Sequence, residues 1–168
     1  MSVRCIKDKA MKNATVRRFE SGDAAAVSAL VIETMRTSNT KDYGAAFIEQ
    51  TVEHFGPESI LKKAGWTHFY VVTDGEKIVG CGAIGPYWDK EDESCLFTIF
   101  VHPACQGRGI GRLIIQTLEE DEYFLRAKRI EVPASITALG FYKKMGYAHK
   151  GGVVQLDDEQ HYPMEKFR

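Results

Sequence analysis

The sequence predicts a mixed α/β domain built on a sheet of five to seven strands, and three observations support this prediction. Apolar residues make up 44% and charged residues 27% of the 168 residues, which is the balance of a globular protein with a core. β-rich runs alternate with runs of helical periodicity along the chain. No linker or shift in composition divides the chain, so we expect a single domain over residues 1–168, with residues 1–13 as an N-terminal extension.

The first third of the chain is expected to form one strand and then helices. Asp23 and the small residues before it are typical of a helix start, and apolar residues follow at helical spacing. Gly56 and Pro57 end a later helical run. The elements expected here are a strand over 15–19, helices over 24–36 and 43–54 with a polar break over 37–42, and a further helical turn or two over 58–64.

The rest of the chain is expected to alternate strands and helices. Asp74 and Gly75 separate two β-rich runs, and both residues tolerate the positive φ of a tight hairpin turn. A polar hairpin tip follows over 89–94. The later elements expected are a strand over 95–103, a glycine-rich turn and helix over 106–128, a strand over 129–135, a short helix over 136–147, and a closing hairpin of 153–156 with 161–167.

Composition argues against several classes of function. The formal net charge is −1, from 22 basic and 23 acidic residues, which gives no reason to expect nucleic acid as a partner. No apolar run approaches the ~18 residues of a membrane span. The four cysteines and five histidines are dispersed, without metal-ligand spacing, so we expect no metal and reduced thiols in a cytoplasmic protein.

The most informative segment is QGRGIGR, residues 106–112, which lies between an apolar strand and an amphipathic helix. Its glycines let the backbone turn tightly and present N–H groups outward. The unpaired amides of the helix start, the helix dipole, Arg108 and Arg112 all favour a diphosphate. The segment lacks the Lys-Ser/Thr of a Walker loop, and the third glycine of the dinucleotide fingerprint would fall on Arg112. The alternative is a glycine-rich turn that serves close packing only.

The segment 101–115, VHPACQGRGIGRLII, resembles the acyl-CoA-binding motif of the GNAT superfamily of N-acetyltransferases, Gln/Arg-x-x-Gly-x-Gly/Ala. A second similarity covers 135–147, where family members often have Asn-x-x-Ala-x-x-x-Tyr-x-x-x-Gly-Phe. Here Ser135 replaces the Asn and Tyr147 the Phe. The C-terminal YPMEK is also similar to many family members. The resemblance is specific over 97–147, the expected acyl-CoA-binding core, and loose in the first 65 residues.

The resemblance implies a GNAT-like acyl-CoA N-acyltransferase fold, with a mostly antiparallel sheet of five to seven strands flanked by about four helices. It implies transfer of the acetyl group of acetyl-CoA, as co-substrate, to a primary amine of a small molecule or peptide by direct attack. A homodimer is compatible with the family. The alternative is a catalytically weak acyl-CoA-binding sensor or regulatory domain. A nucleotide-phosphate-binding protein would need a ribose-reading acid or a Lys-Ser/Thr, and neither is found at the right offset.

The same resemblance implies which residues bind the cofactor. Backbone groups of the strand before the turn would pair with the pantetheine and polarise the acetyl carbonyl. Ser135 would contact the cofactor, or equally well cap the following helix. The full implied set is Ile99, Phe100, Val101, Gln106, Gly107, Arg108, Gly109, Ile110, Gly111, Arg112, Ser135, Ala138 and Tyr142.

Two residues are candidates for the proton transfers. Tyr142 matches the family's general acid, and a phenol with a pKa of about 10 suits donation to a departing thiolate. Packing of Tyr142 as an aromatic on a helix face is the alternative. Many relatives carry a Glu where this chain has Cys95, so the nearby Glu93 is our candidate general base, acting through water. A solvated hairpin tip is the alternative for the acids over 89–93, which together with those over 157–159 could attract a cationic amine.

Overall fold

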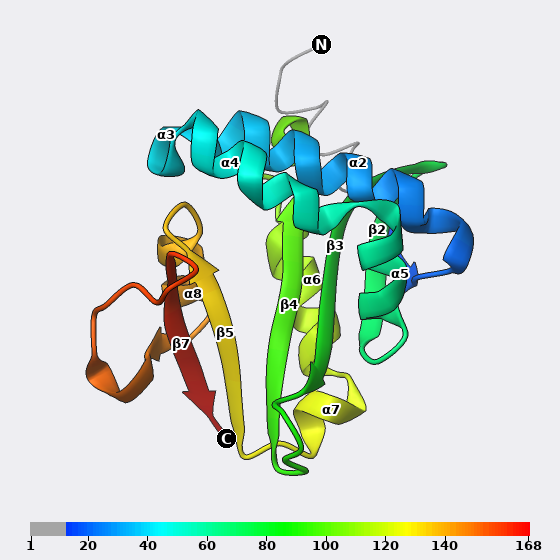
Figure 1. Ribbon diagram of the computed structural model, residues 1–168. Helices are drawn as coiled ribbons and strands as arrows, with labels where there is room; N and C mark the ends of the chain where they lie inside the picture. Colours follow the sequence, from blue (N-terminus) through cyan, green and yellow to red (C-terminus); the bar gives the residue numbers. More distant parts are fainter. Residues whose placement is uncertain (1–12) are drawn as a thin grey trace.

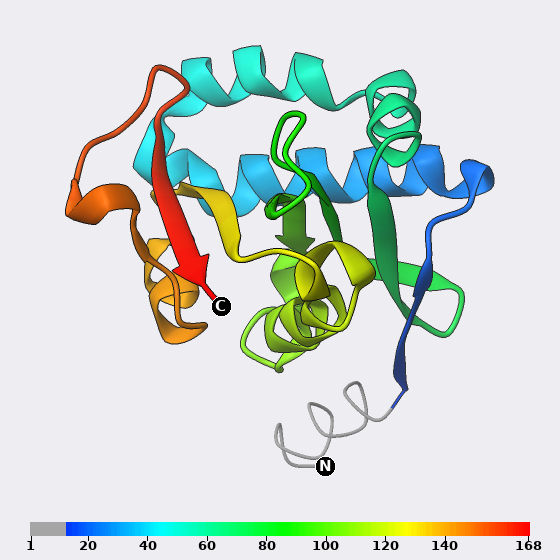
Figure 2. The same cartoon turned by 90° about the horizontal axis from the view of Figure 1, so that it is seen from below.

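The computed structural model describes residues 13–168, and in this part of the chain seven strands form one sheet with helices on both faces (Figures 1 and 2). The prediction of a mixed, mostly antiparallel sheet is confirmed, and the seven strands are the largest number expected. The described residues form more helical segments than the four or so that were expected. The expected extension, residues 1–13, lies outside the described residues except for Asn13. The strands, in the sheet order β1-β2-β3-β4-β5-β7-β6, are β1 (Ala14–Arg18), β2 (His68–Asp74), β3 (Lys77–Pro86), β4 (Glu93–Val101), β5 (Arg129–Ser135), β7 (His161–Phe167) and β6 (Ala148–His149).

The helices divide the apolar side chains between two cores, one on each face of the sheet. Val71 and Val72 are neighbours in β2 and enter opposite cores, as the period-two alternation of a strand requires. The helices are α2 (Ala24–Thr34), α3 (Thr40–Tyr43), α4 (Ala45–Val52), α5 (Pro57–Ala64), α6 (Ile110–Glu119), α7 (Glu122–Leu125) and α8 (Leu139–Lys144).

The polar break predicted over 37–42 is wrong, because the helix continues there. A π-helical turn, Met35–Asn39, joins α2 to α3, and the helical path ends only at Gly44, whose φ is 77°. The polar side chains are satisfied along the helix itself: the Thr40 hydroxyl donates to the carbonyl of Arg36 (2.7 Å). The polar residues over 37–42 therefore form a solvated helix face, and composition alone does not distinguish such a face from a loop.

The predicted closing hairpin is also wrong in its first strand. Residues 153–156 form no strand, and β7 pairs with the two-residue β6 instead. Gly151 and Gly152 both have positive φ (59° and 73°) and turn the chain away after β6. Another boundary differs as well: Glu93 begins β4 and so does not belong to the hairpin tip. The hairpin between β2 and β3 is confirmed, with Gly75 at a φ of 63°.

No helix in the described part of the chain has both the length and the apolar character needed to cross a bilayer. Among residues 13–168, no three His, Cys, Asp or Glu side chains are grouped so that they could hold a metal ion. Cys81, Cys95 and Cys105 are free thiols.

Candidate active site

The two central strands of the sheet separate to form an opening. β4 and β5 pair in parallel only over Glu93–Cys95 and Arg129–Glu131. Beyond these residues the strands diverge towards α3 and α4, so the sheet is V-shaped (Figure 1). The edge of β4 from residue 96 onward therefore has no strand partner on the β5 side.

A β-bulge in β4 lies on the edge of this opening. Thr98 and Ile99 together face the single residue Gly82 of β3, and Thr98 has a φ of 52°, which is rare for a β-branched residue. A Cβ at Gly82 would lie 2.6 Å from the Ile114 side chain of α6, so only glycine fits there. A bulge redirects the backbone groups beside it, and here those groups border the opening.

The glycine-rich turn before α6 leaves its amides free. Gly107 and Gly109 have φ values of 75° and 84°, conformations that favour glycine. Within the described part of the chain, no group accepts a hydrogen bond from the backbone N–H groups of residues 107–112. These amides open a helix whose dipole adds partial positive charge, so the turn can bind an anion. Gly111 also serves packing, because a Cβ there would lie 3.1 Å from the Phe141 ring.

A cavity of about 390 Å³ connects this turn with the open edge of β4. We call it the cofactor cavity. It is lined by every residue of the predicted cofactor set except Arg108. It is also lined by residues that the sequence analysis missed, including Thr34, Ser38 and Asn39 of the N-terminal helical region. The Gln106 side-chain amide donates to Ser38 Oγ (3.1 Å) and to the Val101 carbonyl (3.2 Å), so it ties this region to the turn.

A second cavity, of about 580 Å³, lies on the other side of the opening, and we call it the acceptor cavity. Six residues line both cavities: Asn39, Ile99, Phe100, Ser135, Ala138 and Tyr142. The two cavities therefore adjoin at these residues, and a group held in one can reach a group held in the other. We call this place the junction.

Tyr142 of α8 stands at the junction. Its side chain is buried, and its hydroxyl has no hydrogen-bond partner among the described residues. Burial raises the pKa of Tyr142 above its ordinary value, so the phenol keeps its proton at neutral pH. The structure thus presents a protonated donor at the place where the two cavities meet. Ser135, nearby, accepts a hydrogen bond from the Ala138 amide (3.1 Å) in the turn that precedes α8, and it is not the N-cap residue of that helix.

The N-terminal helices are hydrogen-bonded to the β5 side of the V. Tyr43 Oη accepts from the Ile136 amide and donates to the Gln160 carbonyl, both at 2.8 Å. The Thr137 hydroxyl donates to Asp42 at 2.6 Å. The sequence carried no signal for these contacts, because Asp42 and Tyr43 lie more than ninety residues from their partners.

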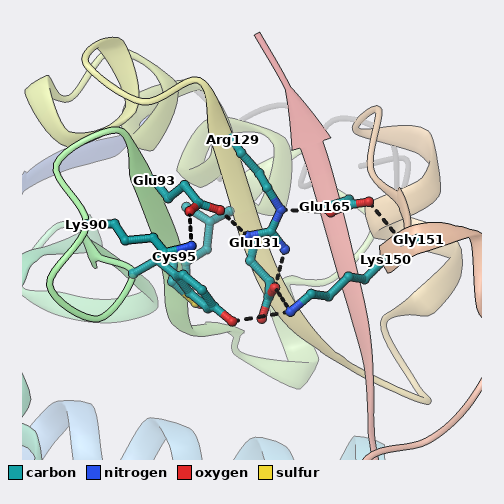
Figure 3. Close-up of polar contacts among 10 residues, drawn as sticks. Lys90, Glu93, Cys95, Arg129, Glu131, Lys150, Gly151 and Glu165 are labelled. Carbon is teal, nitrogen blue, oxygen red and sulfur yellow. Dashed lines mark hydrogen bonds and ion pairs between the residues drawn. The ribbon is translucent and has the colours of Figure 1, made fainter.

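Glu93 lies at the closed end of the V, inside an ion-pair cluster (Figure 3). Its carboxylate contacts Lys90 Nζ (2.6 Å) and Arg129 Nη1 (2.8 Å). The hydrogen bond from Lys90, with that from Arg129, lowers the pKa of Glu93, and the residue lines neither cavity. This position argues against Glu93 as general base, since even a base that acts through water must border the cavity that holds the amine, and it needs a pKa nearer neutrality. The sequence analysis placed Glu93 in a hairpin tip. In the structure Glu93 begins β4 and pairs with Arg129 of β5, which puts its side chain in the ion-pair cluster.

Arg129 is the centre of this cluster, which we call the Arg129 cluster. Its guanidinium contacts Glu93, Glu131 and Glu165, the last at 2.7 Å, and so links β4, β5 and β7. Lys150 adds a contact to Glu131 at 2.8 Å. Burial acts to lower the pKa of Arg129, but the hydrogen bonds that it donates to its three carboxylate partners outweigh burial and raise that pKa. Cys95 is buried beside the cluster, where burial raises the pKa of its thiol to about 12, so it is not an activated nucleophile.

The family comparison identifies the protein with this fold and two-cavity site as an acyltransferase of the acetyltransferase class. The chain belongs to the GNAT family, because residues 65–149, half of its length, match the family's acetyltransferase (GNAT) domain. The match ends at His149 and covers the bulge, the glycine-rich turn and Tyr142. It leaves out the N-terminal helices that line the acceptor cavity.

Solved structures with the same fold align with nearly the whole chain. The PaiA N-acetyltransferase of Thermoplasma acidophilum, crystallised with coenzyme A, is 16% identical with a TM-score of 0.76, covering 92% of this chain and 99% of that one. A GCN5-related N-acetyltransferase of Rhodopseudomonas palustris is 21% identical with a TM-score of 0.76, covering 93% and 96%. A Mycobacterium tuberculosis protein, crystallised in complex with CoA, is 20% identical with a TM-score of 0.65, covering 92% and 99%.

Proposed function

We propose that the protein transfers the acetyl group of acetyl-CoA to a primary amine of a small molecule or peptide by direct attack. The observation that carries this proposal is the junction of two cavities, with unpaired amides along one and the Tyr142 hydroxyl at the meeting point. The coenzyme A in the crystals of the T. acidophilum and M. tuberculosis proteins supports the choice of donor.

The cofactor cavity supplies the anchor. The diphosphate of coenzyme A would accept hydrogen bonds from the amides of residues 107–112, with Arg112 contributing full charge. The pantetheine would lie along the free edge of β4 and pair with backbone groups of residues 99–101. An N–H on this edge would stabilise the oxyanion that forms when the amine attacks the thioester carbon.

Tyr142 would serve the departing thiolate. As the C–S bond breaks, the sulfur takes the electron pair, and the phenol donates a proton or a hydrogen bond to it. Burial raises the pKa of Tyr142, so the phenol carries the proton that the thiolate needs. The proton that the amine loses would leave through the acceptor cavity, where His54, Glu159 and His161 are able to accept it. The main catalytic contribution is then the placement of a neutral amine beside the thioester.

One observation favours the second candidate, an acyl-CoA-binding sensor without turnover. Among the described residues, Glu159 is the only carboxylate that lines the acceptor cavity, and none lines the cofactor cavity. A sensor needs the anchor but no base at the junction. The two candidates therefore agree on coenzyme A binding and differ only in turnover.

Two measurements separate these functions. Coenzyme A should raise the melting temperature, whereas ATP and NAD should not, because a ligand that binds the native state stabilises it by mass action. Thiol release from acetyl-CoA across a panel of primary amines then tests turnover. Release with an amine above the rate of hydrolysis supports the enzyme. Stabilisation by coenzyme A without release supports the sensor, and no stabilisation would contradict both.

A further inference from the structure

Lys63 of α5 is a half-buried cation in the wall of the acceptor cavity. Its ammonium lies 4.5 Å from the centre of the Phe97 ring and 5.4 Å from that of Trp66. No carboxylate of the described residues lies within ion-pair distance of it, and burial lowers its pKa. An anion placed beside Lys63 would restore that pKa and gain a charge-assisted contact.

The rest of the acceptor cavity is aromatic and basic rather than acidic. Its single carboxylate among the described residues, Glu159, has a side chain that is 84% exposed. His161 Nδ1 is buried without a hydrogen bond, and lies 3.9 Å from Glu159. The acids over 89–93, which the sequence analysis expected to attract a cationic amine, do not line the cavity. The cavity is walled by six aromatic side chains: Tyr43, Phe47, Phe55, Phe97, Phe100 and Tyr142.

Lys63 lies beside a part of β4 that does not belong to the junction. It contacts Phe97, whereas the β4 residues shared by both cavities are Ile99 and Phe100. An acceptor whose amine reaches the junction would therefore have to extend past Phe97 to bring another group to the Lys63 ammonium.

We propose that the acceptor is a monoamine with an aromatic or apolar body and one anionic group, and that Lys63 binds that anionic group. This inference rests on the proposed function, because it names the substrate of the same site. The aromatic walls take the body of the acceptor, and Lys63 makes the specificity-determining contact. A polyamine does not fit this cavity, since only the exposed Glu159 could pair with its additional charges.

The test uses three acceptors that differ mainly in charge: 4-(aminomethyl)benzoate, the neutral 4-(aminomethyl)benzamide, and benzylamine. For the unmodified protein we expect kcat/KM to be about tenfold or more higher for the benzoate than for the benzamide, since a charge-assisted hydrogen bond is worth at least that much. Lys63→Met should abolish the preference for the benzoate over the benzamide, and Lys63→Arg should retain it. Lys62→Met is the matched control, because Lys62 is exposed on the same helix and does not line the cavity.

Each outcome decides the inference. Equal rates for benzoate and benzamide in the unmodified protein overturn it, as does an equal loss for all three acceptors in Lys63→Met. If no amine releases thiol, the proposed function fails, and binding of 4-methylbenzoate in the presence of coenzyme A decides the inference instead. Stabilisation of the unmodified protein but not of Lys63→Met would then support an anion site at Lys63, and equal melting temperatures would overturn it.

Discussion

The two ends of the V formed by β4 and β5 use the same pair of strands in opposite ways. At the closed end, three residues of each strand pair and the Arg129 cluster joins β4, β5 and β7. At the open end, the β5-facing edge of β4 beyond Cys95 has no partner strand within the described part of the chain, and a bulge redirects its backbone. The closed end satisfies its polar groups internally, whereas the open end leaves them available for a ligand.

This difference shows how a sheet can carry a binding site without losing its integrity. Unpaired backbone groups in the middle of a sheet are costly unless something else accepts them. The closed end limits that cost to a few residues, because three carboxylates around Arg129 hold the strands where they still pair. We therefore expect changes at the open end to affect binding and turnover, and changes at the closed end to affect stability.

The largest effect is expected at the open end, from Gly109→Val. Gly109 has a φ of 84°, which a β-branched residue resists, and the added side chain would stand in the way of the diphosphate. Stabilisation of the protein by coenzyme A should disappear, as measured by thermal unfolding. Gly22→Val is the control, because Gly22 has a negative φ and open space around it. Retained coenzyme A binding in Gly109→Val would contradict the assignment of the turn.

The next largest effect is expected from Tyr142→Phe at the junction. Loss of the Tyr142 hydroxyl should lower kcat roughly a hundredfold, which is within the range of general acid catalysis. The affinity for coenzyme A should stay within about twofold, because the anchor is the glycine-rich turn. Tyr123→Phe, in α7 outside both cavities, should behave as the unmodified protein. Unchanged kcat in Tyr142→Phe would remove this residue from the mechanism.

At the closed end, Arg129→Met should reduce stability. Three carboxylates would lose their shared cation, although Lys90 and Lys150 still contact two of them, so we expect a loss of about 2 kcal/mol in the free energy of unfolding. Urea unfolding measures this loss. Arg36→Met is the matched control, because its ion pair with Glu49 is exposed and should contribute little. Equal stability of the two variants would show that the cluster does not brace the V.

The smallest effect is a pH dependence of that loss. The pKa of Glu93 is lowered by Lys90 and Arg129, and the pKa of Glu165 is lowered by the Gly151 amide and Arg129, against the opposing effect of burial. A carboxyl group with a lowered pKa in the folded state stabilises the protein above its unfolded pKa, about 4.3, and that contribution disappears as the pH falls through the folded value. The difference in melting temperature between the unmodified protein and Arg129→Met should therefore be constant near pH 7 and shrink below about pH 4.3. A difference that grows on acidification would contradict the lowered pKa values.

Local sequence was sufficient for the cofactor half of the site. The glycine-rich turn, the strand before it and Tyr142 lie within fewer than fifty residues. The turn was recognisable from its glycines and its place before a helix, whereas the roles of the strand and of Tyr142 were implied by the GNAT resemblance. The structure brings the predicted residues, apart from Arg108, to one cavity. Glu93 is the instructive exception, because its distance in sequence from the motif said nothing about the arginine that would contact it from β5.

The acceptor half could not be predicted in the same way. Lys63 and Tyr43 lie in N-terminal helices with no recognisable motif, and their contacts run to residues of β4 and of the segment after β5. The polar residues over 37–42 suggested a break because a solvated helix face and a loop have similar compositions. Only the packing of these helices over the opening shows which of their side chains reach the acceptor cavity.

The amino-acid sequence by itself determined the fold class, the GNAT resemblance and the turn that opens α6, because those depend on short-range patterns of glycine, apolar spacing and chain order. Only the tertiary structure shows that Glu93 is held by ion pairs at the closed end and that Tyr142 stands between two cavities. It also places Lys63 in the acceptor cavity with no carboxylate partner among residues 13–168. These properties arise from contacts between residues far apart in the chain, and the burial and charge that set them exist only once the strands and helices have packed.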